Sequence, residues 1–512
     1  MKSDNQNFAH ALVAAAGAHP HRDCLVLGAG PDALVWSYHD LEQFSERMAG
    51  ALASLGTGVG DRVVVQTEKS AEAVALYLGC LRLGAVYVPL NTAYTAAEVH
   101  YFLADAEPKV FVCTGAASGP CSGAAARAGA TLVTLEADGS GSLAEAARAA
   151  EPYSGVAARA AGDLAAIVYT SGTTGRSKGA MLTHGNLASS AEVLRDYWGW
   201  RDDDVLLHAL PIFHVHGLFV ALHCALLGAT PMIFLARFDA AEVAAALPRA
   251  TVMMGVPTFY TRLLERDDVN RDTCANMRLF VSGSAPLTAQ TFAAWEARTG
   301  HRILERYGMS ETMMNTSNPL DGERVAGTVG FPLPGVEARI AAEDGTVLPP
   351  GEIGTIEVKG PNVFAGYWHM PDKTAEEFRD DGFFITGDLA TMDESGRITI
   401  VGRGKDLVIS GGYNIYPKEI ETLLDEMPGV VESAVIGVPH PDFGEGVVAV
   451  LVTDGTAVGQ AEVDRALDGR LARFKQPKAV VTVDALPRNA MGKVQKNQLR
   501  EQYAHLFTQP HP

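Results

Sequence analysis

Short apolar runs alternate with helical stretches through much of the chain. Runs rich in Val, Leu and Tyr occupy residues 62–67 (RVVVQT), 85–90 (AVYVPL), 109–114 (KVFVCT) and 131–135 (TLVTL). Between the first two lies AEAVALYLGCLRLG, residues 71–84, whose length and apolar character predict a buried helix. Strands that alternate with helices favour parallel sheets with helices on their faces. The pattern therefore predicts an α/β fold whose large N-terminal domain is built from layers of parallel sheet and helix.

The pattern changes twice toward the C-terminus. Residues 344–360 (DGTVLPPGEIGTIEVKG) are rich in Gly, Pro and short strands, which predicts a β-rich subdomain. After the glycine-rich stretch 402–417 (GRGKDLVISGGYNIYP) comes a compact series of helix, two strands, helix and strand, with the size of a small α+β domain. We expect the boundary next to Arg403, which gives a large domain over residues 1–403 and a small C-terminal domain over residues 404–512.

Composition narrows the class of protein. The 512 residues are 47% apolar and 20% charged, which is typical of a globular chain. The formal net charge of -19 argues against a nucleic acid or an anionic membrane as a partner, because both attract an excess of Lys and Arg. It leaves room for a small anionic ligand, since a local cluster of cations holds phosphate or carboxylate whatever the global sign.

Three further features bear on location. The six cysteines include no CxxC pair, so neither a zinc site nor a disulfide framework is indicated, and we expect a reduced, cytoplasmic location. Residues 8–20 (FAHALVAAAGAHP) lack a basic leader, which favours a first amphipathic helix over an export signal. Residues 218–236 carry no formal charge, but Gly228 and Pro231 interrupt them, which favours a buried helix, a turn and a buried strand over a membrane span.

A glycine-rich loop, TSGTTGRSKG at 170–179, follows the apolar run LAAIVY. A Walker loop requires GxxxxGK[ST], and here Ser177 stands where Gly is needed and Gly179 where Ser or Thr is needed. The glycines, hydroxyls and two cations still suit a polyphosphate. A solvated Gly/Ser/Thr turn explains the loop alone equally well.

Further motifs change that balance. In order along the chain follow LPIFHVHG (210–217), GSAP (283–286), RYGMSE (306–311), TGD (386–388), the stretch at 402–417 and PRNAMGKVQK (487–496). Together with the loop they resemble the acyl-adenylate-forming superfamily of acyl-CoA synthetases, firefly-type luciferases and nonribosomal adenylation domains, over nearly the whole chain. The resemblance implies ATP, Mg²⁺ and coenzyme A as cofactors and a C-terminal domain that is mobile.

The resemblance assigns a role to each motif. Tyr307 offers a face for adenine, Asp388 accepts hydrogen bonds from the ribose, and Glu311 with Thr174 holds Mg²⁺. Lys493 acts with Glu311 and Thr174 in catalysis, because it steadies the charge that develops as the carboxylate attacks the α-phosphate. Taken singly, each residue has a structural explanation: Tyr307 as core filler, Asp388 as a turn cap, Glu311 as a surface acid and Lys493 as a solvated lysine. The full nucleotide set implied is Thr170, Ser171, Gly172, Thr173, Thr174, Gly175, Lys178, Ser284, Ala285, Pro286, Arg306, Tyr307, Gly308, Met309, Ser310, Asp388 and Arg403.

The resemblance also implies a moving C-terminal domain. Lys405 falls at the hinge position, where rotation would withdraw Lys493. Gly411 and Gly412 would then leave a narrow channel for the pantetheine arm of coenzyme A. Acylation of Lys493 would remove an essential charge, so a lysine acetyltransferase or deacylase acting there is a further candidate partner.

The acyl substrate is the open question. No acid lies in the FHVHG segment to pair a substrate ammonium, and Arg306 directly precedes the tyrosine of RYGMSE. A guanidinium beside an acyl pocket costs desolvation unless an anion meets it, and a second substrate carboxylate would be that anion. Arg262, Ser284 and His216 are the other candidates for this contact. The alternatives are an ion pair of Arg306 with a neighbouring Glu, a solvated Arg262 and a core histidine at 216.

The stretches GVPTFYTRLLE, SGSAPL and ERYGMSE resemble the malonate-activating branch of the superfamily. We therefore expect a ligase that uses ATP to convert malonate into malonyl-AMP and pyrophosphate, then transfers the acyl group to coenzyme A with release of AMP. Its partners are then malonate, ATP and coenzyme A. The alternatives are a ligase for methylmalonate, acetate or a medium-chain acid and, from a different class, an inactive nucleotide-binding protein.

Overall fold

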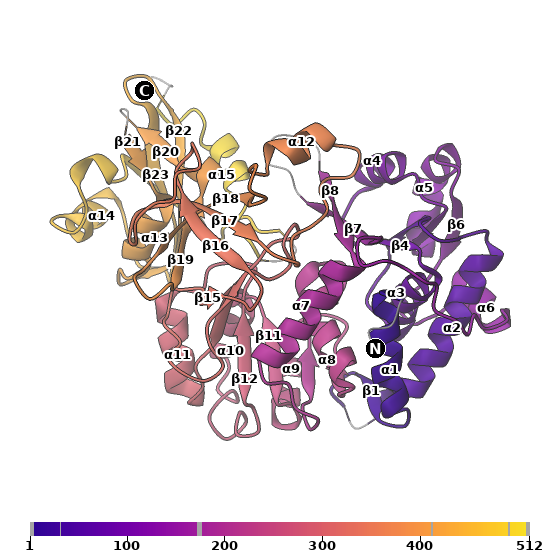
Figure 1. Ribbon diagram of the computed structural model, residues 1–512. Helices are drawn as coiled ribbons and strands as arrows, with labels where there is room; N and C mark the ends of the chain where they lie inside the picture. Colours follow the sequence, from indigo (N-terminus) through magenta and orange to yellow (C-terminus); the bar gives the residue numbers. More distant parts are fainter. Residues whose placement is uncertain (1–4, 31, 171–176, 411–412, 490–491, 508–512) are drawn as a thin grey trace.

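The computed structural model describes residues 5–30, 32–170, 177–410, 413–489 and 492–507. It confirms the α/β fold with a β-rich subdomain and a separate C-terminal unit (Figure 1). No helix within these ranges combines the length and the apolar character that crossing a bilayer requires. Residues 218–236 continue from a π-helix into a short α-helix and then a buried strand, as the interruption by Gly228 and Pro231 predicted.

Two large sheets form the N-terminal part. The nine-stranded sheet is parallel in its centre and antiparallel at both edges, and its order is β15-β14-β13-β12-β11-β9-β10-β1-β2. Its strands are β1 (Asp23–Leu27), β2 (Leu34–Ser37), β9 (Leu206–His208), β10 (Met232–Phe234), β11 (Val252–Gly255), β12 (Leu279–Ser282), β13 (Leu304–Tyr307), β14 (Thr316–Ser317) and β15 (Phe331–Pro332).

The six-stranded sheet has the order β6-β5-β3-β4-β7-β8 and is parallel except for its last pair. Its strands are β3 (Arg62–Gln66), β4 (Val86–Pro89), β5 (Val110–Cys113), β6 (Thr131–Thr134), β7 (Leu164–Thr170) and β8 (Lys178–Thr183).

Helices lie between and outside these sheets because both faces of the parallel strands are apolar. In β3, Val63 and Val65 join the core shared by both sheets, whereas Val64 joins a second core on the outer face. This is the twofold alternation of a strand that is covered on both sides. The inner layer contains α1 (Phe8–Ala18), α2 (Tyr38–Ser54), α3 (Ala71–Leu83), α6 (Ser142–Ala149), α7 (His184–Tyr197), the π-helix η1 (His216–Leu222) and α8 (His223–Gly228).

The outer faces carry the remaining N-terminal helices. Against the six-stranded sheet pack α4 (Ala96–Ala106) and α5 (Gly115–Arg127). Against the nine-stranded sheet pack α9 (Ala240–Ala246), η2 (Leu247–Arg249), α10 (Pro257–Leu264) and α11 (Ala289–Thr299).

The β-rich subdomain is an antiparallel sheet of the order β16-β17-β18-β19. Its elements are β16 (Glu337–Ala341), β17 (Gly354–Lys359), α12 (Pro371–Glu376), β18 (Phe384–Met392) and β19 (Ile398–Arg403). After β19 the chain makes one 3₁₀ turn, η3 (Gly404–Asp406), and enters another sheet.

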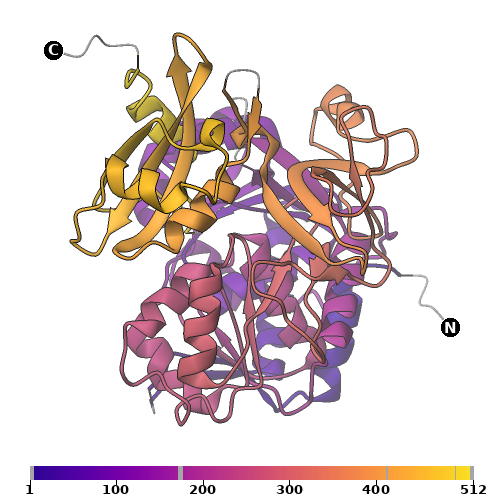
Figure 2. The same cartoon turned by 90° about the vertical axis from the view of Figure 1, so that its left-hand side faces the viewer.

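That last sheet belongs to the C-terminal unit, drawn from orange to yellow in Figure 1 and seen above the nine-stranded part in Figure 2. Its order is β21-β20-β23-β22, with β24 parallel to β23. Its elements are β20 (Val408–Ser410), β21 (Tyr413–Ile415), α13 (Pro417–Asp425), β22 (Val430–His440), β23 (Gly444–Thr453), α14 (Gln460–Leu467), η4 (Arg473–Lys475), β24 (Ala479–Thr482) and α15 (Lys496–Gln502).

The series of elements expected for this unit is present, with one helix shorter than the pattern indicated. The apolar spacing extended the second helix to Phe474, but α14 ends at Leu467. Gly469 takes a left-handed φ of 70°, which a helix cannot continue.

Candidate active site

A first cluster joins the β-rich subdomain to the nine-stranded sheet. The Tyr307 hydroxyl, at the end of β13, donates a 2.6 Å hydrogen bond to Asp388 Oδ2. Arg403 Nε lies 2.7 Å from Asp388 Oδ1, and the two residues are direct partners in the pairing of β18 with β19. Both oxygens of the buried Asp388 are therefore engaged, and the ring of Tyr307 is held in one orientation beside an anion that can accept hydroxyl protons.

A second cluster surrounds Glu311, which is 5% exposed. Its Oε1 accepts a 3.1 Å hydrogen bond from the Tyr367 hydroxyl, and burial raises its pKa. The same hydroxyl lies 2.6 Å from Glu377 Oε2, so its single proton is shared between two carboxylates. Lys178 pairs with Glu377 Oε1 at 2.9 Å and lies 3.9 Å from the centroid of the Tyr367 ring. A carboxylate this buried and this sparsely compensated fits a divalent cation that is also held by phosphate oxygens.

The glycine-rich loop lies between two antiparallel strands. Thr170 ends β7 and pairs with Lys178, the first residue of β8. A Walker loop leads from a strand into a helix, so the strand on its far side agrees with the departure of the sequence from that motif. The predictions for Ser171, Gly172, Thr173, Thr174 and Gly175 lie outside the described residues, as do those for Gly411 and Gly412.

Two lysines of the C-terminal unit face these clusters. Desolvation and the charge of Arg403 lower the pKa of Lys493, while Asp388, Asp406 and Glu311 oppose that shift. Lys493 is therefore close enough to all four side chains to feel their charges. Lys405, in η3, keeps solvent access, but desolvation together with Arg403 lowers its pKa to about 8.

Arg306 lies on the opposite side of β13 from Tyr307 and is 3% exposed. Within the described chain its Nε and Nη2 have no hydrogen-bond partner, and burial lowers its pKa to about 9. The guanidinium occupies the space beside Gly283, where any Cβ would overlap with it. The expected alternative, an ion pair with Glu305, is not formed, because neighbours in a strand point to opposite faces.

The surroundings of Arg306 are polar and neutral. Burial, with the added charge of Arg306, lowers the pKa of His214 to about 4 and that of His216 well below its usual range. His216 Nδ1 lies 3.2 Å from the hydroxyl of Ser284, a residue with a strained φ of 70°. With Ser284 as donor, His216 carries its proton on Nε2, which has no partner among the described residues. The Nε and Nη2 donors of Arg306 and the Nε2 donor of His216, all without partners among the described residues, therefore lie near the Ser284 hydroxyl, a set that fits an anion.

The remaining motif residues support this frame. Gly308 approaches the Met313 carbonyl so closely that a Cβ would overlap with it, and Met309 packs against the main core. Ala285 and Ser310 are half-buried, whereas Pro286 is exposed.

Arg262 is the predicted site residue that does not join Arg306. It is exposed on α10 and lines a different cleft of about 360 Å³, together with Phe213, Arg237 and Arg488. Tyr260 faces inward and feels the charge of Arg306. Residues two positions apart lie on opposite sides of a helix, which explains why Arg262 points away from the acyl pocket.

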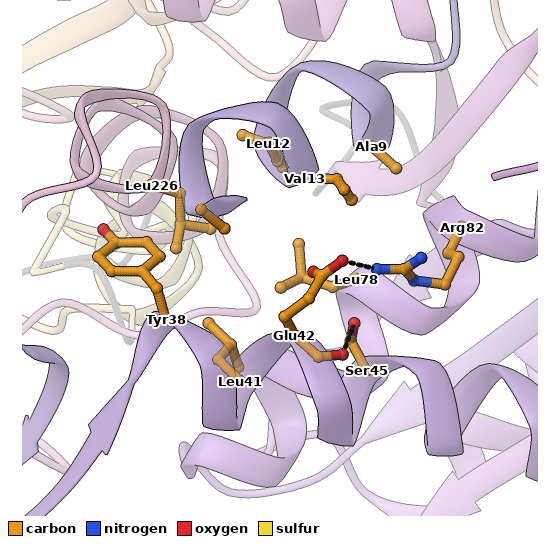
Figure 3. Close-up of a pocket in the computed structure, with 11 residues that line it drawn as sticks. Ala9, Leu12, Val13, Tyr38, Leu41, Glu42, Ser45, Leu78, Arg82 and Leu226 are labelled. Carbon is orange, nitrogen blue, oxygen red and sulfur yellow. Dashed lines mark hydrogen bonds and ion pairs between the residues drawn. The ribbon is translucent and has the colours of Figure 1, made fainter. Parts of the chain in front are cut away.

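A second hollow lies between α1, α2 and α3 (Figure 3). Its volume is about 20 Å³, and apart from the ion pair of Arg82 with Glu42 its walls are mainly apolar. This space admits about one water molecule and no organic acid.

Sequence reasoning missed several contributors. Tyr367 and Glu377 carry no signal in the sequence, because they lie far along the chain from Glu311 and Lys178, which they contact. Gly283 belongs to the GSAP motif, and its closeness to Arg306 could have been suspected from the adjacent positions of β12 and β13 in an α/β sheet.

Comparison with known proteins identifies the family of the chain. Residues 12–368 match the model of the AMP-binding enzyme family, and residues 419–493 match that of the AMP-binding enzyme C-terminal domain. The crystal structure of ATP-bound MatB from Rhodopseudomonas palustris is 57% identical, covers 98% of this chain and all of its own, and superposes with a TM-score of 0.96. Apo MatB from the same organism gives a TM-score of 0.84 at the same identity and coverage.

A relative of lower identity supports the same family. A malonate–CoA ligase of Arabidopsis thaliana is 36% identical over 480 residues, which is 87% of this chain and 78% of that protein. The chain belongs to the AMP-binding enzyme family.

Proposed function

We propose that the protein is a malonate–CoA ligase. It would activate malonate with ATP to give malonyl-AMP and pyrophosphate, and then transfer the malonyl group to the thiol of coenzyme A with release of AMP. The observation that carries this proposal is Arg306, a buried cation without a counterion, beside His216 and Ser284. The substrate named for the Arabidopsis relative supports the same assignment.

The chemistry of malonate explains the pocket. One carboxylate must reach the α-phosphate of ATP. Without Arg306, the other carboxylate would be buried without a counterion. A guanidinium binds a carboxylate through two parallel hydrogen bonds, so Arg306 can hold the second carboxylate with its unpaired Nε and Nη2. A monocarboxylate offers nothing to these donors, and the desolvated charge then stays unpaired. The pocket therefore selects for a dicarboxylate.

The two clusters support the proposed nucleotide-binding residues. Asp388 would accept the ribose hydroxyls, with Tyr307 beside the adenine. Glu311 would hold Mg²⁺, which supplies positive charge against the phosphate oxygens when it is bound. Lys178 would bind phosphate after leaving Glu377. Lys493 would bring its charge to the carboxylate oxygen and α-phosphate as they react, which is the step that most needs a fixed cation.

Coenzyme A would enter by the 360 Å³ cleft. The cleft is lined by apolar side chains such as Phe213 and Phe259, which suit a pantetheine arm, and by Arg237, Arg262 and Arg488, which suit phosphates. We thus assign Arg262 to this cleft rather than to the substrate carboxylate.

The same arrangement supports the proposed domain boundary, the proposed regulation and the proposed location. The chain changes sheets between Arg403, the end of β19, and Val408, the start of β20, which supports domains of residues 1–403 and 404–512 with Lys405 as hinge. The side chain of Lys493 keeps some exposed surface, which supports a lysine acetyltransferase or deacylase as a further partner. All six cysteines are unpaired and buried, which supports a reduced, cytoplasmic location.

The test is the release of AMP in the presence of ATP, Mg²⁺ and coenzyme A, with malonate, acetate or a medium-chain fatty acid as substrate. We expect turnover with malonate and at least about 100-fold lower kcat/KM with acetate, because acetate leaves Arg306 unpaired. Equal or faster turnover with acetate or with the fatty acid would contradict the proposed substrate while leaving the family assignment intact.

A further inference from the structure

Lys69 is a buried lysine outside the motifs of the family. It lies between β3 and α3 and is 8% exposed, with its side chain at the wall of the 360 Å³ cleft. Its Nζ lies 2.8 Å from His208 Nδ1, 2.8 Å from the His208 carbonyl oxygen and 4.1 Å from the centroid of the Phe234 ring. Burial lowers the pKa of Lys69 well below its usual range, with no described carboxylate close enough to offset it. Burial of an amine without a carboxylate partner costs folding free energy, which indicates that Lys69 serves a function.

His208, the partner of Lys69, also contacts the backbone that leads to the acyl pocket. His208 Nε2 lies 2.9 Å from the carbonyl oxygen of Gly217. Because a carbonyl only accepts, Nε2 carries the proton of this imidazole, and Nδ1 is left as the acceptor for Lys69. The three groups form a directed chain in which Lys69 donates to His208 and His208 donates to Gly217.

Gly217 belongs to the first turn of η1, directly after His216. A π-helix leaves some carbonyls without the usual partner four residues on, and such turns are frequent at functional sites. Gly217 also packs against the Pro211 carbonyl so tightly that a Cβ would overlap with it. The His208 contact therefore fixes the backbone at the point that sets the direction of His216, whose imidazole contacts Ser284 and lies beside Arg306.

We propose that Lys69 is a positioning residue for the acyl substrate, which acts through His208 and the Gly217 carbonyl to hold His216 against Ser284 beside Arg306. This inference rests on the proposed malonate–CoA ligase function and names a determinant of its substrate site. Lys69 touches neither nucleotide cluster, so we expect loss of its hydrogen bond to leave ATP binding unchanged while malonate binding weakens.

Steady-state kinetics of Lys69→Met, with malonate and ATP varied separately, test the proposal. Methionine keeps the length and apolar stem but cannot donate. We expect the KM for malonate to rise about 10-fold, as for loss of one hydrogen bond, with the KM for ATP changed less than about twofold. The matched control is Tyr77→Phe, which removes another buried hydrogen bond to a histidine, from Tyr77 to His223 Nε2 at 2.8 Å, outside the site. It should lower the melting temperature without a selective change for malonate.

A second pair of variants keeps the test decisive if Lys69→Met does not fold. His208→Gln retains one donor and one acceptor, and we expect its KM for malonate to stay within about threefold of the wild type. His208→Leu retains neither, and we expect it to match Lys69→Met.

Two results would overturn the proposal: an unchanged KM for malonate in Lys69→Met, or equal behaviour of His208→Gln and His208→Leu. Wild-type protein that does not turn over malonate would instead refute the proposed function on which the inference rests.

Discussion

Replacement of Arg306 by methionine should separate substrate recognition from stability. Burial lowers the pKa of Arg306 from its usual value to about 9, and since a tenfold change in a proton equilibrium is worth 1.36 kcal/mol, the unliganded protein bears a cost of roughly 5 kcal/mol for this charge. Relaxation reduces the measurable part, so we expect Arg306→Met to raise the free energy of unfolding of the unliganded protein by about 1–4 kcal/mol. The same change leaves the second carboxylate of malonate without a partner, which costs about 3–5 kcal/mol of binding.

The assay has two arms. Chemical denaturation without ligands should show a higher midpoint for Arg306→Met at an unchanged slope. AMP release should show a loss in kcat/KM for malonate of at least about 100-fold, with ATP affinity within about twofold of the wild type. A destabilised variant would mean that Arg306 forms a structural ion pair. A variant that keeps its malonate activity would mean that the second carboxylate binds elsewhere.

Three further predictions address the rest of the site. Asp388→Asn should raise the KM for ATP by roughly 10- to 100-fold, because a charged acceptor is lost, while the KM for malonate stays constant; equal shifts in both would contradict a ribose-binding role. Lys493→Gln, or acylated Lys493, should slow formation of malonyl-AMP at least about 100-fold but spare ATP binding and the transfer of synthetic malonyl-AMP to coenzyme A; retained adenylation would argue against the assignment. The pKa of His214 falls from 6.5 unfolded to about 4 folded, so the unfolded chain binds the extra proton and stability is lost as the pH falls from 6.5 to 4. In pH-dependent denaturation, His214→Asn should remove up to about 3 kcal/mol of that loss, and an unchanged profile would show that another group titrates.

The fold could be predicted from the sequence where the hydrophobic pattern is unambiguous. Alternating apolar runs and helical stretches predicted the parallel sheets, and the break at 402–417 marked the start of the last sheet. The predicted end of α14 was wrong, because Asp468 and Gly469 stop a helix whose apolar spacing continues.

The site residues that lie in the sequence motifs could be predicted. Arg306 could be picked out because a cation next to a predicted pocket is chemically unusual. Arg262 could not be oriented, since its position in the sequence gives its helix but not the face of that helix that meets the pocket. Tyr367 and Lys69 were missed because their partners lie far along the chain, and such contacts exist only once the sheets are packed together.

The central claim is that Arg306 binds the second carboxylate of the substrate. Calorimetric binding of two non-hydrolysable adenylate analogues, one with a malonyl and one with an acetyl group, to the wild type and to Arg306→Met measures that contact as a coupling energy. We expect the wild type to prefer the malonyl analogue by about 3 kcal/mol or more and Arg306→Met to lose that preference, because the only difference between the ligands is the second carboxylate. Equal preference in both proteins would contradict the account.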